Sequence, residues 1–208
     1  MKIAIDGPAG SGKTSLARAL AATFGCRYIE TGKMYRAVAL AFERGLALRD
    51  VDIAITDEGR LLLNGEDVSS LLHTPAIDQG SSLVATRRDV RERLVEIQQQ
   101  IAKRGDVIME GRDIGTVVLP DADVKIFLEA SSLERARRRA AEQGIGDIEA
   151  TRAQIEERDR RDSSRTLSPL IPAPDATIIQ TDRKPLVQVI SEAIHLVKER
   201  FDGRCCGG

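Results

Sequence analysis

Eight residues near the N-terminus constrain the fold of this chain more than any other segment. Residues 7–14 read Gly-Pro-Ala-Gly-Ser-Gly-Lys-Thr, which matches the pattern G-x-x-x-x-G-K-[ST]. An apolar run, residues 3–5, precedes them, and a helix-like stretch, residues 15–24, follows. A glycine-rich loop between a strand and a helix directs backbone N–H groups at one anion, beside the positive end of the helix. The pattern predicts a phosphate-binding loop; the alternative is a glycine-rich turn that matches by chance.

Two side chains of this loop have expected tasks of their own. Lys13 is expected to reach the β- and γ-phosphates of a nucleoside triphosphate, and the Thr14 hydroxyl to ligate Mg²⁺. The predicted nucleotide-binding residues are Gly7, Pro8, Ala9, Gly10, Ser11, Gly12, Lys13, Thr14 and Ser15.

Length and charge limit the class of protein. A chain of 208 residues suits a single domain, 1–208. Lys and Arg number 31 against 32 Asp and Glu, so no global charge favours a nucleic-acid or membrane surface. The chain has no Trp and 3% aromatic residues, which disfavours a platform for stacking nucleic-acid bases. The near-neutral charge, with no large apolar patch expected, favours a monomer.

The cysteines and histidines suggest no further chemistry. Cys26, Cys205 and Cys206 do not make a disulfide framework, and the N-terminus enters a strand directly, without a signal peptide. A reducing, cytoplasmic location is the simplest interpretation. His73 and His195 have no neighbours in the sequence that suggest a metal site.

Apolar runs and helix-period segments alternate along the chain, which predicts an α/β fold with a five-stranded, mainly parallel sheet. The expected strands are residues 2–5, 26–30, 107–110, 124–128 and 176–180. The expected helices are residues 15–24, 33–44, 74–104 with a break near Thr86, 131–143, 151–164 and 184–201. Leu16, Leu20 and Phe24 recur at four-residue steps and predict a buried face, and Ser131 or Ser132 suits the N-cap of the helix at 131–143. The expected buried side of the last helix carries Leu186, Val189, Ile190, Ala193 and Val197. In a small insert, 46–72, a strand at 61–63 enters a hairpin turn at Asn64-Gly65. The loop at 7–14 then lies at the carboxyl edge of the sheet, where ligands bind.

Two segments after predicted strands are candidates for further ligand contacts. In residues 31–36, the Thr31 hydroxyl and Arg36 suit a second phosphate; the alternative is a helix-capping Thr with a solvated Arg. In residues 110–116, Glu110 suits a metal or its waters. Arg112 suits a transferred phosphate, and Asp113 an amino group. The alternative for this second segment is an ion pair within a loop.

A third candidate is the charged helix at 157–165. Arg158, Arg161, Asp162 and Arg165 share one face. Three arginines without matching carboxylates suit a flap that closes on anions and excludes water, and the alternative is a solvated face. Arg135 and Arg139 lie one turn apart on the preceding helix. They could contact the triphosphate donor, but a position on a solvated face is the simpler interpretation.

Taken together, these segments resemble bacterial cytidylate kinases, which phosphorylate CMP and dCMP. The resemblance runs over nearly the whole chain, and its most specific parts are Gly-Arg-Asp-Ile-Gly-Thr-Val-Val at 111–118 and Glu-Arg-Asp at 157–159. It implies a three-layer P-loop NTPase fold, with residues 46–72 in the monophosphate-binding part and 145–166 as a helical lid. It also implies transfer of a phosphoryl group from ATP, with Mg²⁺, to CMP or dCMP.

The resemblance implies a role for each matching residue. Ser82, Arg91 and Asp113 are expected at the cytosine edge, Arg158 and Asp162 at the ribose, and Arg36, Arg112 and Arg165 at the CMP phosphate. Thr31 and Tyr35 complete the expected substrate contacts. Lys13, Arg112, Arg161 and Arg165 are the expected catalytic residues, with Thr14 and, through water, Glu110 at the metal.

Two other functions stay open. In the first, the chain is a kinase that phosphorylates another nucleoside monophosphate. Asp113 with Arg91 argues against this function, because the two residues suit a base that carries an amino group. In the second, the chain is a nucleotide-dependent switch. No Asn-Lys-x-Asp sequence for reading guanine occurs, and a switch has little use for a second anion site.

Overall fold

The computed structural model describes residues 1–56, 58–144 and 146–205, and the chain divides into two compact units. One unit contains residues 1–28 and the chain from residue 105 onward, and the other contains residues 29–104. The predicted insert, 46–72, lies inside the second unit. The organisation as a single kinase domain with a lid stays a prediction.

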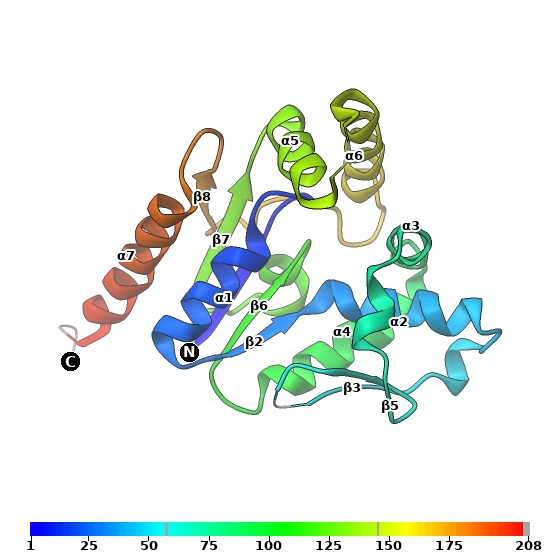
Figure 1. Cartoon of the computed structure of the whole chain (residues 1–208). Helices are drawn as coiled ribbons and strands as arrows, with labels where there is room; N and C mark the ends of the chain where they lie inside the picture. Colours follow the sequence, from blue (N-terminus) through cyan, green and yellow to red (C-terminus); the bar gives the residue numbers. More distant parts are fainter. Residues whose placement is uncertain (57, 145, 206–208) are drawn as a thin grey trace. The chain divides into compact units, whose positions relative to one another are not determined.

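A five-stranded sheet forms the centre of the first unit (Figure 1). Its order is β2 (Arg27–Glu30), β6 (Val107–Gly111), β1 (Lys2–Asp6), β7 (Val124–Glu129) and β8 (Thr177–Gln180). β1 pairs in parallel with β6 and β7, and β7 with β8. The three central strands, β6, β1 and β7, are rich in apolar residues because they are buried along nearly their whole length. The predicted α/β class with a five-stranded parallel sheet is confirmed.

The central position of β1 places the phosphate-binding loop. Asp6, the last residue of β1, lies opposite Gly111 of β6 and Phe127 of β7. The chain leaves β1 toward one side of the sheet and later returns to the other, so the strand order reverses here. Ligands of open α/β sheets bind at the carboxyl ends of the strands at such a point.

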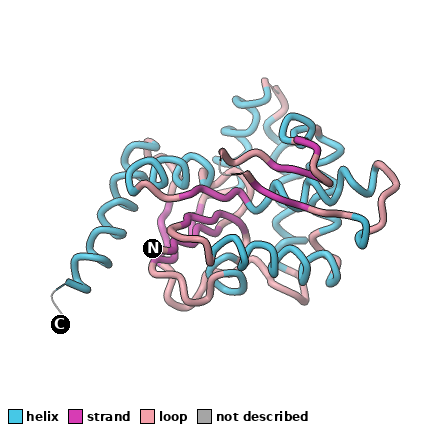
Figure 2. Tube along the Cα trace, turned by 90° about the horizontal axis from the view of Figure 1, so that it is seen from below, coloured by secondary structure: helices cyan, strands magenta, loops and turns pink. Residues whose placement is uncertain are grey.

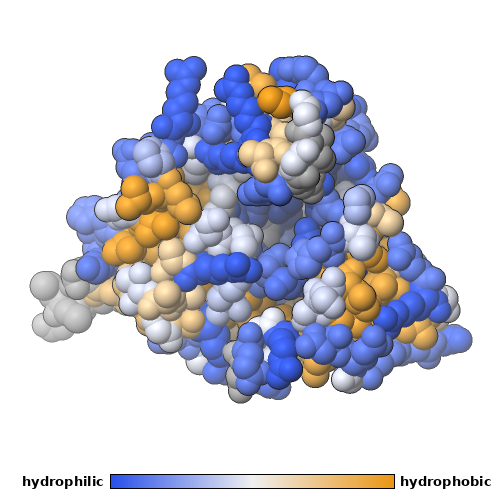
Figure 3. Space-filling view, in the orientation of Figure 1, coloured by the Kyte–Doolittle hydropathy of each residue, from blue (hydrophilic) through white to orange (hydrophobic). Residues whose placement is uncertain are grey.

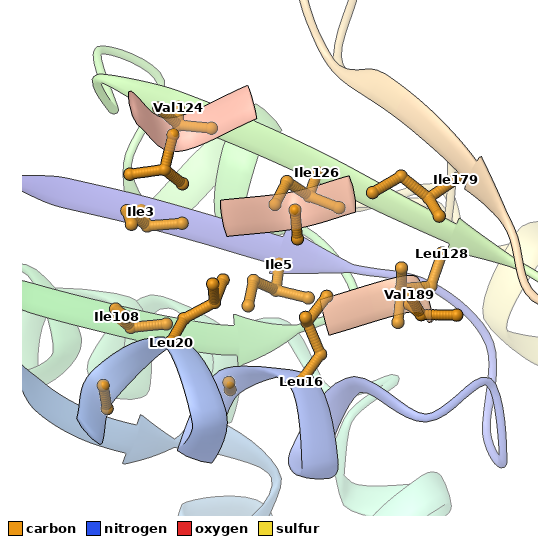
Figure 4. Close-up of a cluster of buried hydrophobic side chains, with 14 residues drawn as sticks. Ile3, Ile5, Leu16, Leu20, Ile108, Val124, Ile126, Leu128, Ile179 and Val189 are labelled. Atoms are coloured by element: carbon orange, nitrogen blue, oxygen red, sulfur yellow. The ribbon is translucent and has the colours of Figure 1, made fainter. Parts of the chain in front are cut away.

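Two helices bury their apolar stripes against one face of this sheet. α1 (Lys13–Phe24) contributes Leu16 and Leu20, and α7 (Leu186–Cys205) contributes Val189. Figure 4 shows these side chains against the isoleucines of β1. The four-residue spacing on α1 therefore marked the buried face correctly, whereas Leu186, expected on the buried side of α7, is exposed. α7 continues to Cys205, beyond the predicted end, and Cys206 lies outside the described residues.

Helix caps set the beginning of the two other helices of this unit. Ser131 accepts a 3.3 Å hydrogen bond from the Glu134 N–H and begins α5 (Ser132–Gln143), as predicted. Asp147 accepts a 2.9 Å bond from the Ala150 N–H and begins α6 (Ile148–Ser163) three residues before the expected start. Residue 145 of the expected lid lies outside the described residues. A π-helical turn, Ile114–Val118, follows β6 and was not predicted.

The second unit combines helices with a small antiparallel sheet, whose strands form a separate magenta group in Figure 2. Its elements are α2 (Thr31–Glu43), 3₁₀ turns at Leu48–Asp50 and Ser69–His73, β3 (Ile53–Ile55), β4 (Leu61–Leu63), β5 (Glu66–Asp67), α3 (Pro75–Val84) and α4 (Arg88–Ala102). The predicted hairpin turn is confirmed: Asn64 and Gly65 have φ of 50° and 84°. The predicted helix break near Thr86 is confirmed, whereas β3 was missed.

The edge strand β8 carries exposed apolar side chains. Ile178 is exposed on β8, and Leu186 and Val187 are exposed at the beginning of α7. Figure 3 shows the apolar area over these two elements. The monomer was expected in part because no large apolar patch was expected, and this local patch weakens that argument. The monomeric state stays a prediction. Among the described helices, none has the length and apolarity needed to cross a bilayer.

Candidate active site

The phosphate-binding loop requires glycine where neighbouring chain approaches closely. A Cβ on Gly7, whose φ is 147°, would lie 2.4 Å from the Leu128 carbonyl oxygen. Gly12, with φ of 95°, is the N-cap residue of α1, which begins at Lys13. The first N–H groups of a helix have no partner within it, and they favour an anion. The loop therefore has the backbone geometry that phosphate binding needs.

Lys13 is buried, and its Nζ donates a 2.7 Å hydrogen bond to the Pro8 carbonyl. Burial, together with the nearby Arg112 charge, lowers the pKa of Lys13 to about 7, although Glu110 and Asp6 oppose the shift. A phosphate beside this amine would stabilise its charged form. An anion bound here would therefore gain a charged partner in Lys13.

Glu110 joins the loop to β6. Its Oε1 accepts a 2.8 Å hydrogen bond from the Thr14 hydroxyl and another from the Tyr28 hydroxyl. A hydroxyl and a carboxylate fit Mg²⁺, which proteins often hold by one or two carboxylates together with substrate phosphates and water. Thr14 and Glu110 therefore fit the metal role expected of them, and metal binding itself stays a prediction.

A buried carboxylate on α6 holds two arginines. Arg112 Nε donates a 2.8 Å hydrogen bond to Asp162 Oδ2, and Arg165 donates to Oδ1. Burial alone would raise the pKa of Asp162, but the two guanidinium groups hold it below its usual value. The expectation of arginines without matching carboxylates is therefore wrong for Arg165. The solvated-face alternative is wrong for Asp162 and Arg165, because their side chains are 2% and 6% exposed.

Arg158 and Arg161 lie on α6, whereas Arg165 follows the end of this helix. The Arg161 side chain is partly exposed, and its Nε lies 3.7 Å from Glu157 Oε1. Arg158 is half-buried three residues before it. Both stay candidates for the roles that the sequence suggested.

Asp113 is buried directly after Arg112 and is the N-cap residue of the π-helical turn. Its carbonyl accepts hydrogen bonds from the N–H groups of Val117, at 2.9 Å, and Val118, at 3.2 Å. The backbone of this residue is therefore held by the turn that follows it.

Arg135 is buried, so the solvated position favoured for it is wrong. Its guanidinium bonds both oxygens of Asp159 on α6, at 3.1 and 2.5 Å, and the Ala9 carbonyl of the loop, at 3.1 Å. Nε donates to the Ala130 carbonyl at 3.0 Å. Arg135 thus ties the expected lid helix and the phosphate-binding loop to α5.

In the second unit, Arg36 lies between two carboxylates. Its Nη2 is 3.2 Å from Asp78 Oδ1, and its Nη1 is 3.6 Å from Glu30 Oε1. The alternative of a solvated Arg36 is therefore wrong. Thr31 is buried as the first residue of α2, whose cap residue is Glu30, so the capping alternative for Thr31 is wrong too.

Ser82, Arg91 and Tyr35 also belong to this unit. The Arg91 guanidinium lies 5.6 Å from the centroid of the Tyr35 ring and donates a 3.1 Å hydrogen bond to the Ala85 carbonyl. Ser82 Oγ is buried without a hydrogen-bond partner among the residues described. A buried hydroxyl in this state is unfavourable by itself, and it suits contact with a polar ligand.

Comparison with known proteins identifies the family. The family model described as cytidylate kinase matches residues 3–199. The chain belongs to the cytidylate kinase family. A cytidylate kinase from Pelotomaculum thermopropionicum is 49% identical over 207 residues, covering 90% of this chain and 92% of that relative. One from Mycobacterium leprae is 45% identical over 214 residues, covering 95% of this chain and 96% of the relative.

Solved structures agree with the fold. A gluconokinase from Sinorhizobium meliloti 1021 matches with a TM-score of 0.56 at 16% identity, covering all of this chain and 97% of its own. At this identity the likeness shows the fold alone. The family model and the two relatives, not these structures, confirm the resemblance seen in the sequence.

The site residues of this cytidylate kinase family member fall into two sets. The first unit holds the loop at 7–15 with Glu110, Arg112, Asp113, Arg158, Arg161, Asp162 and Arg165, and the second holds Thr31, Tyr35, Arg36, Ser82 and Arg91. Sequence reasoning missed the contacts of Tyr28, Asp78 and Asp159, because they depend on residues far away in the chain. It also assigned no role to Asp6.

Proposed function

We propose that this protein transfers the γ-phosphoryl group of ATP to CMP or dCMP, forming ADP and CDP or dCDP. The observation that carries the proposal is the cytidylate kinase family match over residues 3–199. The relatives from Pelotomaculum and Mycobacterium bear the same name over nearly their whole length. The phosphate-binding loop and the arginine cluster supply the two anion-binding elements that such a reaction requires.

The chemistry consists mainly of alignment and charge neutralisation. Lys13 holds the donor phosphates, and Thr14 and Glu110 hold Mg²⁺. When bound, Mg²⁺ neutralises charge on the β- and γ-phosphate oxygens. Arg112, Arg161 and Arg165 offset charge on the transferring group. No strong general base is needed, because the attacking oxygen of the CMP phosphate is already anionic.

The acceptor contacts are proposals residue by residue. Arg36, Arg112 and Arg165 bind the CMP phosphate, and Thr31 and Tyr35 complete the substrate contacts. Ser82, Arg91 and Asp113 bind the cytosine edge, supported by the buried hydroxyl of Ser82 and the burial of Arg91 and Asp113. Arg158 and Asp162 bind the ribose; the pairing of Asp162 with two arginines adds a second task for that carboxylate. A cytoplasmic location stays a prediction.

An ADP-release assay across CMP, dCMP, UMP, AMP and dTMP tests the proposal. We expect CMP and dCMP to support the fastest release, and Lys13→Ala to lower turnover about 100-fold or more while the fold survives. Preference for UMP or AMP would favour another monophosphate kinase. Nucleotide binding without transfer to any monophosphate would favour the switch, and a folded Lys13→Ala protein with full turnover would exclude the assignment.

A further inference from the structure

Asp6 makes a contact for which the proposed mechanism has no use. One carboxylate oxygen accepts a 2.8 Å hydrogen bond from the Ile114 N–H, and the other accepts a 2.7 Å bond from the Gly115 N–H. Both oxygens are thus bound to consecutive backbone donors. Asp6 belongs to β1, whereas Ile114 and Gly115 begin the π-helical turn.

The contact joins the two segments that bear the chemistry. Asp6 directly precedes Gly7, the first residue of the phosphate-binding loop. Ile114 directly follows Arg112 and Asp113. The first N–H groups of a helical turn lack partners within the turn, and a carboxylate satisfies them well. Asp6 therefore links the end of β1, beside the phosphate-binding loop, to the turn that directly follows Arg112 and Asp113.

The surroundings leave little freedom for this contact. A Cβ added to Gly115 would lie 3.4 Å from Asp6 Oδ2 and 3.2 Å from Lys125 Cδ. The side chain of Asp6 is itself buried, at 4% exposure. Gly115 is thus packed directly against the carboxylate, so a change in Asp6 displaces the turn.

The buried carboxylate is unfavourable for stability. Burial raises the pKa of Asp6 to about 6, even though the Gly115 and Ile114 N–H groups oppose the shift. A neutral side chain of the same shape would avoid the loss of hydration. Stability alone therefore gives no reason for an acid at this position.

We propose that Asp6 is a positioning residue for phosphoryl transfer, which holds Arg112 and Asp113 in register with the phosphate-binding loop through the Ile114 and Gly115 N–H groups. This inference rests on the proposed function. Asp6 acts through the backbone of the turn, to which both of its carboxylate oxygens are bonded.

Asp6→Asn is the decisive variant, because the amide keeps the size of the side chain but can accept only one of the two bonds. Its NH₂ group would face an N–H group, so the turn must shift. We expect kcat to fall about ten-fold or more with CMP and ATP saturating, because small misplacement of a catalytic group is costly to rate. We also expect an unfolding midpoint equal to or above that of the wild type, and faster hydrogen exchange in peptides that cover residues 112–119.

Asp123→Asn is the matched control. Asp123 Oδ2 also accepts a backbone N–H of β1, that of Lys2 at 2.7 Å, but at the end of the strand away from the loop. This variant should keep its kcat. Gly115→Ala is a second variant. Its added Cβ would lie 3.2 Å from Lys125 Cδ and 3.4 Å from Asp6 Oδ2, so it crowds the turn beside the acid without changing the acid. We expect a smaller fall in kcat.

Each outcome decides for or against the inference. A fall in kcat with retained stability and faster exchange at residues 112–119 supports it. Wild-type kcat in folded Asp6→Asn overturns it, as does a parallel loss of kcat and stability in both Asp6→Asn and Asp123→Asn. If Asp6→Asn fails to fold, full activity of Gly115→Ala overturns it. If the wild-type protein phosphorylates no monophosphate, the proposed function is overturned instead. Hydrogen exchange at residues 112–119 would then still show whether Asp6 holds the turn.

Discussion

Arg112 donates a hydrogen bond of 2.8 Å from Nε to the carboxylate of Asp162, whose side chain is 2% exposed. Arg165 donates to the other oxygen of the same carboxylate. One buried acid thus orients two arginines that we propose to bind the CMP phosphate. It also compensates two positive charges that would repel each other without it.

Asp162→Ala should destabilise the protein by about 3 kcal/mol, because removal of one partner leaves buried charges uncompensated. Urea unfolding would measure the loss. Glu66→Ala is the control: its ion pair with Arg44 is solvent-exposed, so this variant should lose far less stability than Asp162→Ala. Equal losses in the two variants would show that the Asp162 cluster contributes no more than a surface ion pair.

Lys13→Met should stabilise the protein near neutral pH while it abolishes turnover. Burial lowers the pKa of Lys13 from 10.5 to about 7, so the folded state binds this proton less tightly than the unfolded state. The wild type therefore gains stability as pH rises from 7 toward 10.5, and the variant lacks this gain. We expect the variant to be more stable by roughly 2–4 kcal/mol at pH 6, with the difference shrinking by pH 9.5.

Urea unfolding of both proteins from pH 6 to 9.5 would measure this difference. Parallel stability curves would contradict the lowered pKa of Lys13. Lys198→Met, an exchange on the polar side of α7, serves as the control and should give a curve parallel to that of the wild type.

Binding of MgADP at pH 8 should take up protons. Free Lys13 is mostly neutral at this pH, since its pKa is about 7, and a bound phosphate favours the charged amine. Calorimetry in buffers of different ionisation enthalpy would measure an uptake of up to about one proton. Lys13→Arg, which is charged at every pH, should bind without this uptake. The same uptake in both proteins would assign the proton to another group.

Asp78→Asn should lower the KM for CMP about two- to five-fold. Arg36 Nη2 lies 3.2 Å from Asp78, so the substrate phosphate must compete with this carboxylate for the guanidinium. Steady-state kinetics with saturating ATP would measure the change. Asp89→Asn, which breaks the exposed Arg87–Asp89 pair of the same unit, should leave the KM unchanged. A raised KM in Asp78→Asn would mean that Asp78 orients Arg36 for the substrate.

Features that depend on neighbouring residues were predictable from the sequence. The loop at 7–14, the hairpin turn at Asn64-Gly65 and the Ser131 cap each follow from local backbone preferences, and the structure contains all three. The alternation of strands and helices was sufficient to predict the five-stranded parallel sheet. Helix α6 began earlier than expected, because Asp147 caps it and the apolar pattern there is weak.

The sequence could propose the candidate site as a set of residues, but it could not give their contacts. Arg112 was proposed in one segment, and Asp162 and Arg165 in another; the pairing of both arginines to that acid was missed. Arg135 was expected in solvent and is buried against Asp159. Charged patterns are ambiguous because the same spacing suits a solvated face and a buried ion pair.

By itself, the sequence determined the phosphate-binding loop, the α/β class and the family. These depend on short motifs and on periodicity, which neighbouring residues specify. Only the tertiary structure decided which groups meet: Asp6 with Gly115, 109 residues away, Tyr28 with Glu110, 82 residues away, and Arg135 with Ala9, 126 residues away. Such contacts depend on strand order and packing, because the chain between the partners carries no local signal of where it returns.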